Sequence, residues 1–372
     1  MISFSGVGAS GSEVRGTVDV GGESFVVWFR VVGAPVEVSA EAFSVLALPA
    51  AMARGLAVES PGSLTEGFVA GLGRWQEVFA TWFPDRLAPV EVRGGRRRSR
   101  RPARGRACFF TGGVDSFFSA LRHVESLDAL VFVHGFDVPL VELPDLRAVV
   151  TSGVRAAASE LGVPLVEVET NLHDFSDAMG LPWGTTYHGV ALAAVAHLLA
   201  PAFGEVLVGG THTYSDLFPW GSHPLSDRLL SSDRVRLVHD GGDTDRVQKT
   251  VGVAGSEVAL RHLRVCWENR DGTYNCGVCK KCLRTMIALR IAGKLEACET
   301  LPHEIDLDAV RALALGDVNT LARHAELVLH LRDLGTEPDL LAACVDVIRD
   351  YDPDQMPWGS RDWTSILPLL RS

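Results

Sequence analysis

Short apolar runs alternate with helical spacings of apolar residues through the middle of the chain. The expected strands are ACFFT, ALVFVHG, VPLVEVET and EVLVGGT, and the expected helices span 115–124, 142–161 and 187–200. Short β-branched runs that alternate with helices are typical of a parallel sheet. Residues 107–300 are therefore expected to form an α/β domain. Ligands of such sheets bind beyond the carboxyl ends of the strands, so informative residues should follow each strand.

The segments on either side follow other patterns. Within residues 1–92, the strand-like runs EVRGTVDV and ESFVVWFRVV are joined by Gly21-Gly22, which is a hairpin signal, and helical stretches follow at about 40–57 and 64–83. We expect a small N-terminal α+β domain there and a helical C-terminal region over 301–372. Residues 93–106 are rich in arginine. Two interpretations of this segment stay open, namely a solvated linker and a contact with phosphate or RNA.

Composition narrows the class of protein. The chain has 372 residues, of which 47% are hydrophobic and 22% are charged, so it can bury a core for two or three domains. A formal net charge of -11 argues against a general nucleic-acid binder. The start lacks the basic and apolar regions of a secretory signal, and the most apolar stretch, GVALAAVAHLLAPAF, is too short to cross a bilayer. We expect a soluble, cytoplasmic protein without membrane association.

A glycine loop follows the first strand of the α/β domain. The strand ACFF leads directly into Thr111-Gly112-Gly113-Val114-Asp115-Ser116 and then into an apolar helix. Adjacent glycines let backbone N–H groups approach an anion, and the helix start adds unpaired N–H groups and its positive dipole. The hydroxyls of Thr111 and Ser116 can bind phosphate oxygens, and Asp115 can hold Mg²⁺ against them. Because no Gly-Lys-Ser/Thr follows, this is not a Walker loop. The alternative is an ordinary strand-to-helix turn.

Four of the seven cysteines cluster near the end of the α/β domain, at Cys266, Cys276, Cys279 and Cys282. Two residues between consecutive thiolates let them converge on one ion, and a fourth thiolate closes a tetrahedron. Such a site has no open position for water, so we expect structural Zn²⁺. A ferredoxin-type iron–sulfur cluster is the rival, but its pattern requires another Cys followed by Pro, and Leu-Arg-Thr-Met follows Cys282.

The loop TGGVDS together with C-x9-C-G-x-C-x-x-C resembles the 7-cyano-7-deazaguanine synthase family of queuosine biosynthesis, within the PP-loop (N-type ATP pyrophosphatase) superfamily. The resemblance covers roughly residues 105–295 and includes the segment VGGTHTYSDLFPWGSHP. In that superfamily the loop grips the pyrophosphate of ATP. The chain departs from the family in its N-terminal unit, in its helical tail and in the amino-acid sequence of the loop after the fourth strand.

The resemblance implies a PP-loop fold of the adenine nucleotide alpha hydrolase type and the activity of a carbon–nitrogen ligase. A substrate carboxylate, such as that of a deazapurine, would be adenylated by ATP with release of pyrophosphate, and ammonia or an amine would then displace AMP. The cofactors implied are ATP, Mg²⁺ and Zn²⁺.

Five further residues are candidates for the site. Asp216, after the fourth strand, could contact substrate or metal. His134 and Asp137 end the second strand, where superfamily members receive adenine and ribose. Arg246 and Lys249 are three apart on a predicted helix start, as a phosphate clamp requires. Each also has an ordinary structural interpretation, as a loop cap or a surface residue. His212, after the same strand as Asp216, could likewise serve only as a structural hydrogen-bonding residue. Trp183 and Trp220 either stack on a planar substrate or pack in the protein interior.

Three alternatives to a small-molecule ligase stay open. The arginine segment favours a PP-loop enzyme that modifies or thiolates tRNA, although the net charge opposes it. The same adenylation chemistry could join a deazapurine to a protein amine, with the N-terminal unit binding the protein partner. A nucleotide-binding scaffold without turnover is the third, and a homodimer is compatible with all of them.

Overall fold

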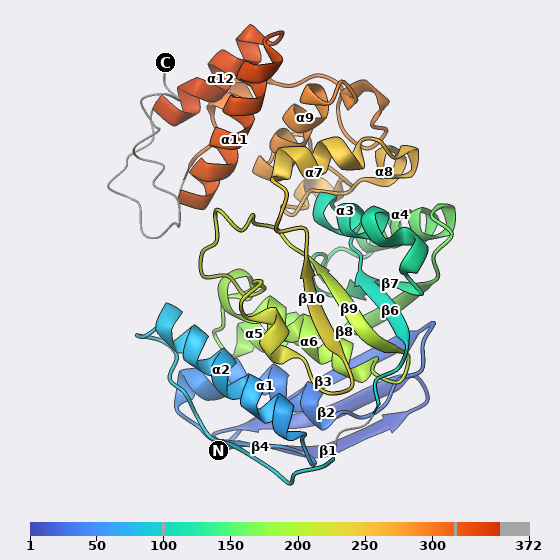
Figure 1. Cartoon of the computed structure of the whole chain (residues 1–372), viewed down its shortest axis with the longest axis vertical. Coiled ribbons are helices and arrows are strands. Elements are labelled where there is room, and N and C mark those ends of the chain that lie inside the picture. Colours follow the sequence, from blue (N-terminus) through green and yellow to red (C-terminus); the bar gives the residue numbers. More distant parts are fainter. Residues whose placement is uncertain (99–100, 316–317, 350–372) are drawn as a thin grey trace.

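The computed structural model describes residues 1–98, 101–315 and 318–349. The last part of the helical region expected over 301–372 therefore lies outside the described residues. Figure 1 shows the N-terminal strands at one end of the molecule and the last described helices at the other.

The strands form one mixed sheet in the order β10-β9-β6-β7-β8-β3-β2-β1-β4-β5. Their bounds are β1 (Ile2–Ser10), β2 (Glu13–Val20), β3 (Glu23–Val32), β4 (Val58–Glu59), β5 (Val92–Arg93), β6 (Gly105–Phe109), β7 (Ala129–His134), β8 (Leu165–Thr170), β9 (Phe203–Gly209) and β10 (Arg236–Asp240). Strands β8, β7, β6, β9 and β10 pair in parallel, which confirms the α/β class and the parallel sheet.

The N-terminal strands continue this sheet. The hairpin of β2 and β3 forms as predicted, with Gly21 and Gly22 at positive φ, and β3 then pairs antiparallel with β8 from Phe29↔Thr170 to Val32↔Glu167. The unit is α+β as expected, but its strands and those of the α/β domain belong to a single sheet. The domain boundaries at 92 and 106 stay a prediction.

The helices lie on both faces of the sheet and beyond one end of it. They are α1 (Ala40–Arg54), α2 (Glu66–Trp82), α3 (Val114–His123), α4 (Pro144–Glu160), α5 (Leu172–Ala178), α6 (His188–Leu198), α7 (Arg246–Val253), α8 (Glu257–His262), α9 (Lys280–Ile291), α10 (Leu307–Arg311), α11 (Val318–Leu334) and α12 (Pro338–Arg349). Short 3-10 or π segments are η1 (Val124–Ser126), η2 (Trp183–Tyr187), η3 (Asp227–Leu230), η4 (Arg270–Gly272) and η5 (Leu295–Ala297).

Three apolar cores hold these layers together. One joins α1, α2 and α6 to one face of the sheet, and in it the hydroxyl of the buried Tyr187 donates to Leu46 O over 2.9 Å. The second packs α3 and α4 against the opposite face, and the third joins α9 to α11 and α12. Because the first core contains both Phe43 and Val206, it crosses from the N-terminal unit into the α/β region.

Two glycines of α2 give a matched test of this packing. A Cβ on Gly71 would lie 2.3 Å from the backbone oxygen of Leu229 in η3, whereas a Cβ on Gly73 would meet nothing within 4 Å. Gly71→Ala should therefore lower the free energy of unfolding by about 1–3 kcal/mol, as overpacking does. Gly73→Ala should raise it by about 0.4–1 kcal/mol, because it only restricts the unfolded chain. Denaturant unfolding measures both, and equal effects would contradict the close contact between α2 and η3.

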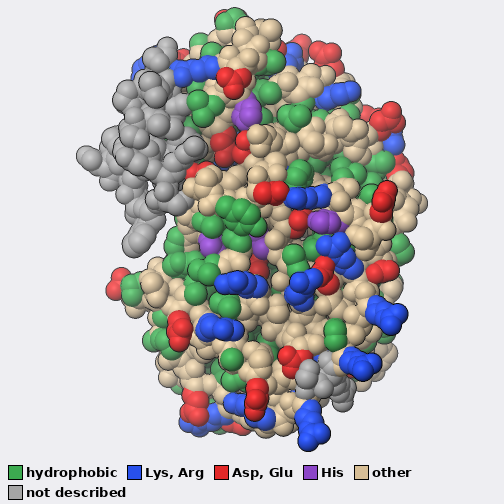
Figure 2. Space-filling view, viewed as in Figure 1, with side chains coloured by type: hydrophobic (Ala, Val, Ile, Leu, Met, Phe, Trp, Pro, Cys, Tyr) green, Lys and Arg blue, Asp and Glu red, His purple; other side chains and the backbone are tan. Residues whose placement is uncertain are grey.

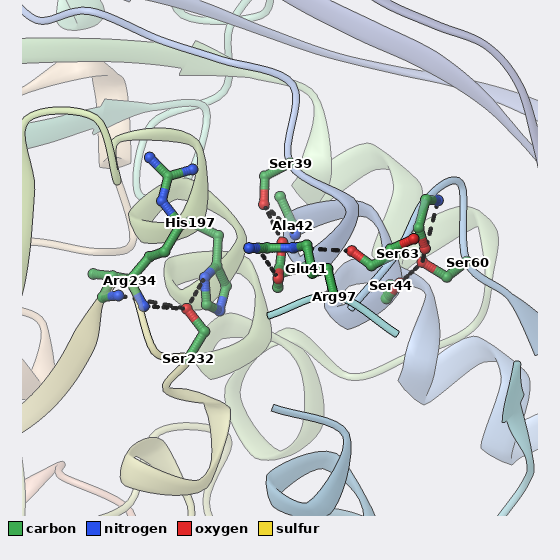
Figure 3. Close-up of polar contacts among 12 residues, drawn as sticks. Ser39, Glu41, Ala42, Ser44, Ser60, Ser63, Arg97, His197, Ser232 and Arg234 are labelled. Carbon is green, nitrogen blue, oxygen red and sulfur yellow. Dashed lines mark hydrogen bonds and ion pairs between the residues drawn. The ribbon is translucent and has the colours of Figure 1, made fainter. Parts of the chain in front are cut away.

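The arginine-rich segment is partly bound to the fold. Arg93 lies in β5, which pairs with β4, and the guanidinium of Arg97 binds the carboxylate of Glu41 and donates to Ser63 O over 3.1 Å (Figure 3). Glu41 also accepts from Ser39, and both side chains are buried. Arg106, in β6, donates to Glu205 over 2.6 Å. These arginines therefore help to fasten the segment to α1 and to the sheet.

Most of the predicted elements are present within a few residues of their expected bounds. The strands β1, β4, β5 and β10 were missed, because β1 is interrupted by glycines, β4 and β5 have only two residues each, and β10 follows a long irregular loop. None of the helices in the described part of the chain combines the length and the apolar composition needed to cross a bilayer.

Candidate active site

The glycine loop joins β6 to α3 as the sequence predicts. Gly112 has a φ of 76°, a value that side chains with a Cβ rarely adopt, and α3 begins at Val114 directly after Gly113. Gly113 offers no side chain to cap the helix, so the first N–H groups of α3 are available to an anion.

Hydrogen bonds within the loop fix its shape. The Thr111 N–H donates to Ser116 Oγ over 3.2 Å, and the Ser116 hydroxyl donates to Gly113 O over 3.0 Å. From outside the loop, the backbone N–H of Arg264 donates to Gly112 O over 2.8 Å. The segment that leads to Cys266 thus supports the glycine loop directly.

A cavity of about 360 Å³ lies at the carboxyl ends of β6, β7 and β9. It is lined by residues of the loop, by apolar strand residues and by five cationic side chains, against the two carboxylates Asp115 and Asp137. Predicted site residues that line it are Thr111, Gly113, Val114, Asp115, Ser116, Asp137 and Arg246. An excess of positive charge in a partly enclosed cavity favours a polyanionic ligand.

Asp115 is held ionised at the start of α3. Burial would raise the pKa of its carboxyl, but Arg246, Lys249 and Arg323 outweigh burial and keep that pKa below its usual range. Arg246 pairs with Oδ2. Oδ1 is buried, has no hydrogen-bond partner within the described ranges and lies 3.8 Å from Lys249 Nζ. An ionised carboxylate with such an oxygen, at the start of a helix that follows a glycine loop, is chemically able to serve as a ligand of Mg²⁺.

Lys249 lies beneath the loop rather than in the cavity wall. Its side chain is 1% exposed, and Nζ donates to Gly210 O at the end of β9. Burial lowers the pKa of this amine, and Asp115 opposes that shift. Arg246 and Lys249 do share one face of α7, but that face meets Asp115. Both cations therefore position the carboxylate, and Arg246 also lines the cavity.

Four cations of the cavity were not among the predicted site residues. Arg264 precedes Cys266, Lys281 and Arg284 flank Cys282 on α9, and Arg323 comes from α11 in the C-terminal helical region. The nearness of Lys281 and Arg284 to the cysteines was a usable signal, since α9 starts directly after Cys279. For Arg323 the chain carries no local signal.

Aromatic side chains also form part of the wall. Trp183 and Trp220 both line the cavity, as does His188, whose ring centroid lies 5.9 Å from that of Trp220. Trp183 begins the π-helical segment η2, a kind of irregularity that is frequent at functional sites. A Cβ on Gly184 would lie 3.0 Å from the Trp220 ring, so this close approach depends on glycine.

Other predicted residues lie near the cavity but not in its wall. His134 faces Glu167, with 2.9 Å between Nε2 and Oε2, and burial lowers the pKa of its imidazole. Asp216 accepts from Thr213 over 3.1 Å and from Ser215 over 2.8 Å, and with His212 it lines a smaller adjoining chamber.

The four predicted cysteines converge as a group that could hold a metal ion. The sulfurs of Cys266, Cys276, Cys279 and Cys282 all lie within 4.8 Å of one another. Two of the separations, Cys266–Cys279 and Cys276–Cys282, are 3.9 Å. Metal–sulfur bonds of about 2.3 Å place the sulfurs of a tetrahedron about 3.8 Å apart, so the spacing fits zinc.

Asn275 joins the two segments that carry these cysteines. Its Oδ1 accepts from the N–H groups of Val265 and Cys266 over 2.9 and 3.1 Å, and its Nδ2 donates to Leu263 O over 2.9 Å. The cysteine cluster is thereby linked to Arg264 and through it to the glycine loop.

No protein-family model, curated protein or solved structure matches this chain. The function is therefore inferred from the geometry and charge of this cavity.

Proposed function

We propose that this protein is an ATP-dependent ligase of the PP-loop class that adenylates a substrate carboxylate, similar to 7-cyano-7-deazaguanine synthase. The observation that carries the proposal is the glycine loop at the start of α3, opening into a cavity with five cationic side chains at the ends of parallel strands. A triphosphate is the common ligand that matches both the anion-binding backbone and this charge.

The first step joins the acid to the nucleotide. A carboxylate oxygen attacks the α-phosphorus of ATP, the bond to the bridging oxygen of the pyrophosphate breaks, and pyrophosphate leaves with the electron pair. The loop N–H groups and Arg246 hold the leaving group, and Arg264, Lys281 and Arg284 stabilise charge on the phosphates. Bound Mg²⁺, with Asp115 as a ligand, would neutralise the pyrophosphate oxygens.

The second step releases AMP. An amine attacks the acyl carbon, the bond from that carbon to the AMP oxygen breaks, and the nitrogen loses a proton. Adenylation is required because hydroxide is a poor leaving group and AMP is a good one. The protein's contribution to this step is the position of the two reactants and the exclusion of water.

The aromatic wall favours a planar acid. Trp183 and Trp220 offer ring faces and edges beside the apolar Val133 and Val208, which suits a heteroaromatic ring such as that of a deazapurine. The carboxylate of such a ring would be directed toward the cationic side of the cavity.

RNA has less support as the substrate than a small carboxylic acid. Arg97 and Arg106, from the segment that favoured RNA, are engaged in ion pairs with Glu41 and Glu205. On the face drawn in Figure 2, basic and acidic side chains are interspersed. Conjugation to a protein amine uses the same adenylation and differs only in the nucleophile.

We propose Zn²⁺ for the cysteine cluster, in a structural role. Four thiolates would saturate the ion and leave no position for substrate or water. Because Cys279 caps α9 and Cys282 lies in its first turn, the cluster would orient Lys281 and Arg284 toward the phosphates.

Phosphorus NMR of ATP with magnesium and ammonium tests the ligase proposal. A heteroaromatic carboxylate such as 7-carboxy-7-deazaguanine, and a panel of other acids, are added one at a time. We expect AMP and pyrophosphate to appear with one acid only. ADP and phosphate as products would contradict the proposal.

A further inference from the structure

A small chamber adjoins the nucleotide cavity. It has a volume of about 20 Å³ and shares Thr211, Arg246 and Arg323 with the cavity wall. Its other lining residues are His212, Thr213, Asp216, Phe218, Ala322 and Glu326. A space of this size holds one molecule as large as water, which needs about 10–15 Å³. The chamber therefore suits ammonia or the amino group of a larger amine.

Glu326, on α11, has one carboxylate oxygen in an unusual state. Its Oε2 is buried and has no hydrogen-bond partner among the described residues, and the carboxylate accepts from the backbone N–H of Arg246. Burying a carboxylate oxygen that has no donor costs free energy, so a missing donor is expected there. An ammonium or amine N–H is such a donor.

The charges around Glu326 come from three elements. Asp216 lies in the loop after β9, Asp245 and Arg246 lie at the start of α7, and Arg323 lies one turn earlier on α11. Burial raises the pKa of Glu326 to about 7, Asp245 and Asp216 add to this, and Arg323 opposes it. Burial also lowers the pKa of His212, and Arg323 adds to this, so this imidazole is neutral.

We propose that this amine chamber binds the attacking amino group and that Glu326 takes up its proton. The proposal rests on the ligase function proposed above and adds the place of the nucleophile and its base. Ammonia fills the chamber alone, whereas a larger amine places only its amino group there and leaves the rest of the molecule in the cavity.

The proton transfer is balanced at each atom. An ammonium ion gives one proton to the Glu326 carboxylate, which becomes neutral, and the free nitrogen lone pair then attacks the acyl carbon of the adenylate. The bond from that carbon to the AMP oxygen breaks, AMP leaves beside Arg246 and Arg323, and the nitrogen gives a second proton to the released phosphate, which leaves a neutral amide. A base whose pKa lies near the working pH is the most effective for this transfer.

The test separates adenylation from amine attack. Acid-dependent exchange of pyrophosphate into ATP, measured without amine, reports the first step alone. Glu326→Gln should leave this exchange within about twofold, which also shows that the variant is folded. It should lower kcat/KM for ammonium by about 10²-fold or more, as the loss of a general base does. Asp333→Asn, an exposed carboxylate on the same helix, should change neither measurement.

A pH profile of the wild-type enzyme gives a second readout. With kcat/KM expressed per total ammonia, the profile should level off near pH 7, because Glu326 is then ionised. In Glu326→Gln it should continue to rise toward the pKa of free ammonium. Glu326→Asp should restore part of the wild-type profile, since it keeps a carboxylate.

The outcomes are distinct. Normal exchange in Glu326→Gln with an unchanged ammonium dependence, or a wild-type profile that also keeps rising, overturns the amine chamber alone. Absence of exchange in the wild-type enzyme with every acid overturns the ligase function and the chamber together. Methylamine and glycinamide, compared with ammonium, show whether the amino group comes from ammonia or from a larger amine.

Discussion

Asp115→Asn should lower acid-dependent exchange of pyrophosphate into ATP by about 10²–10³-fold, the range found when one preorganised electrostatic group is removed from an active site. The carboxylate is the ion partner of Arg246 and lies 3.8 Å from Lys249 Nζ. Its loss removes the expected Mg²⁺ ligand and leaves two cations without their counterion. Binding of ATP in the absence of Mg²⁺ should therefore be retained or tightened, because a negative charge beside the phosphates is gone.

The matched control is Asp145→Asn. Asp145 is also an acidic residue in the first turn of a helix that follows a parallel strand, but it is exposed at the start of α4. Both variants lose a similar interaction with a helix dipole, worth about 0.3–1 kcal/mol. Only Asp115→Asn should lose exchange. Equal exchange in both variants would show that the charge of Asp115 has no part in the chemistry.

The glycine loop and the cysteine cluster could be predicted because each is encoded locally. A loop with Gly112 at positive φ, followed by a helix, needs only neighbouring residues to form. Likewise, three of the four cysteines lie within one short segment, so their spacing alone indicates a shared ion.

The rest of the site depends on contacts between distant segments. Arg323 and Glu326 reach the cavity and the amine chamber from α11, and Lys249 is buried against Gly210. The sequence of α11 does not show which face of this helix meets the α/β core, because apolar residues lie next to charged residues all along it. His134 lies at the carboxyl end of β7 as expected, but which way its ring is directed, toward Glu167 on β8, could not be predicted from the sequence.

The N-terminal unit was likewise predictable only where its structure depends on neighbouring residues. Its hairpin and its two helices were predictable from turn glycines and apolar spacing. The pairing of β3 with β8 was not, because β8 alternates polar and apolar residues, β3 is mostly apolar, and neither pattern names the neighbouring strand. Pairing partners are set by tertiary packing, which a single strand pattern does not contain.

Loss of the metal should have the second large effect. The protein should bind one equivalent of zinc, and Cys276→Ser should lose it, because three thiolates bind Zn²⁺ far more weakly than four. Loss of the proposed ion should free the start of α9, where Cys279 accepts from the Cys282 N–H, and should displace Lys281 and Arg284 from the cavity. We expect the free energy of unfolding to fall by about 4 kcal/mol or more, as is typical when a structural metal is lost. Affinity for ATP should fall with it.

Cys298→Ser is the control for this prediction. Cys298 is buried near the cluster, but its sulfur lies 3.6 Å from Thr300 Oγ1 and is not among the four that converge. This variant should keep one equivalent of zinc and its affinity for ATP, even if the core is somewhat less stable. Elemental analysis with nucleotide titration checks both variants. Iron with a visible absorption band in the wild-type protein would instead identify an iron–sulfur cluster. Because the cysteine segment supports Gly112 through Arg264, retention of ATP affinity after complete metal loss would show that the glycine loop is rigid without it.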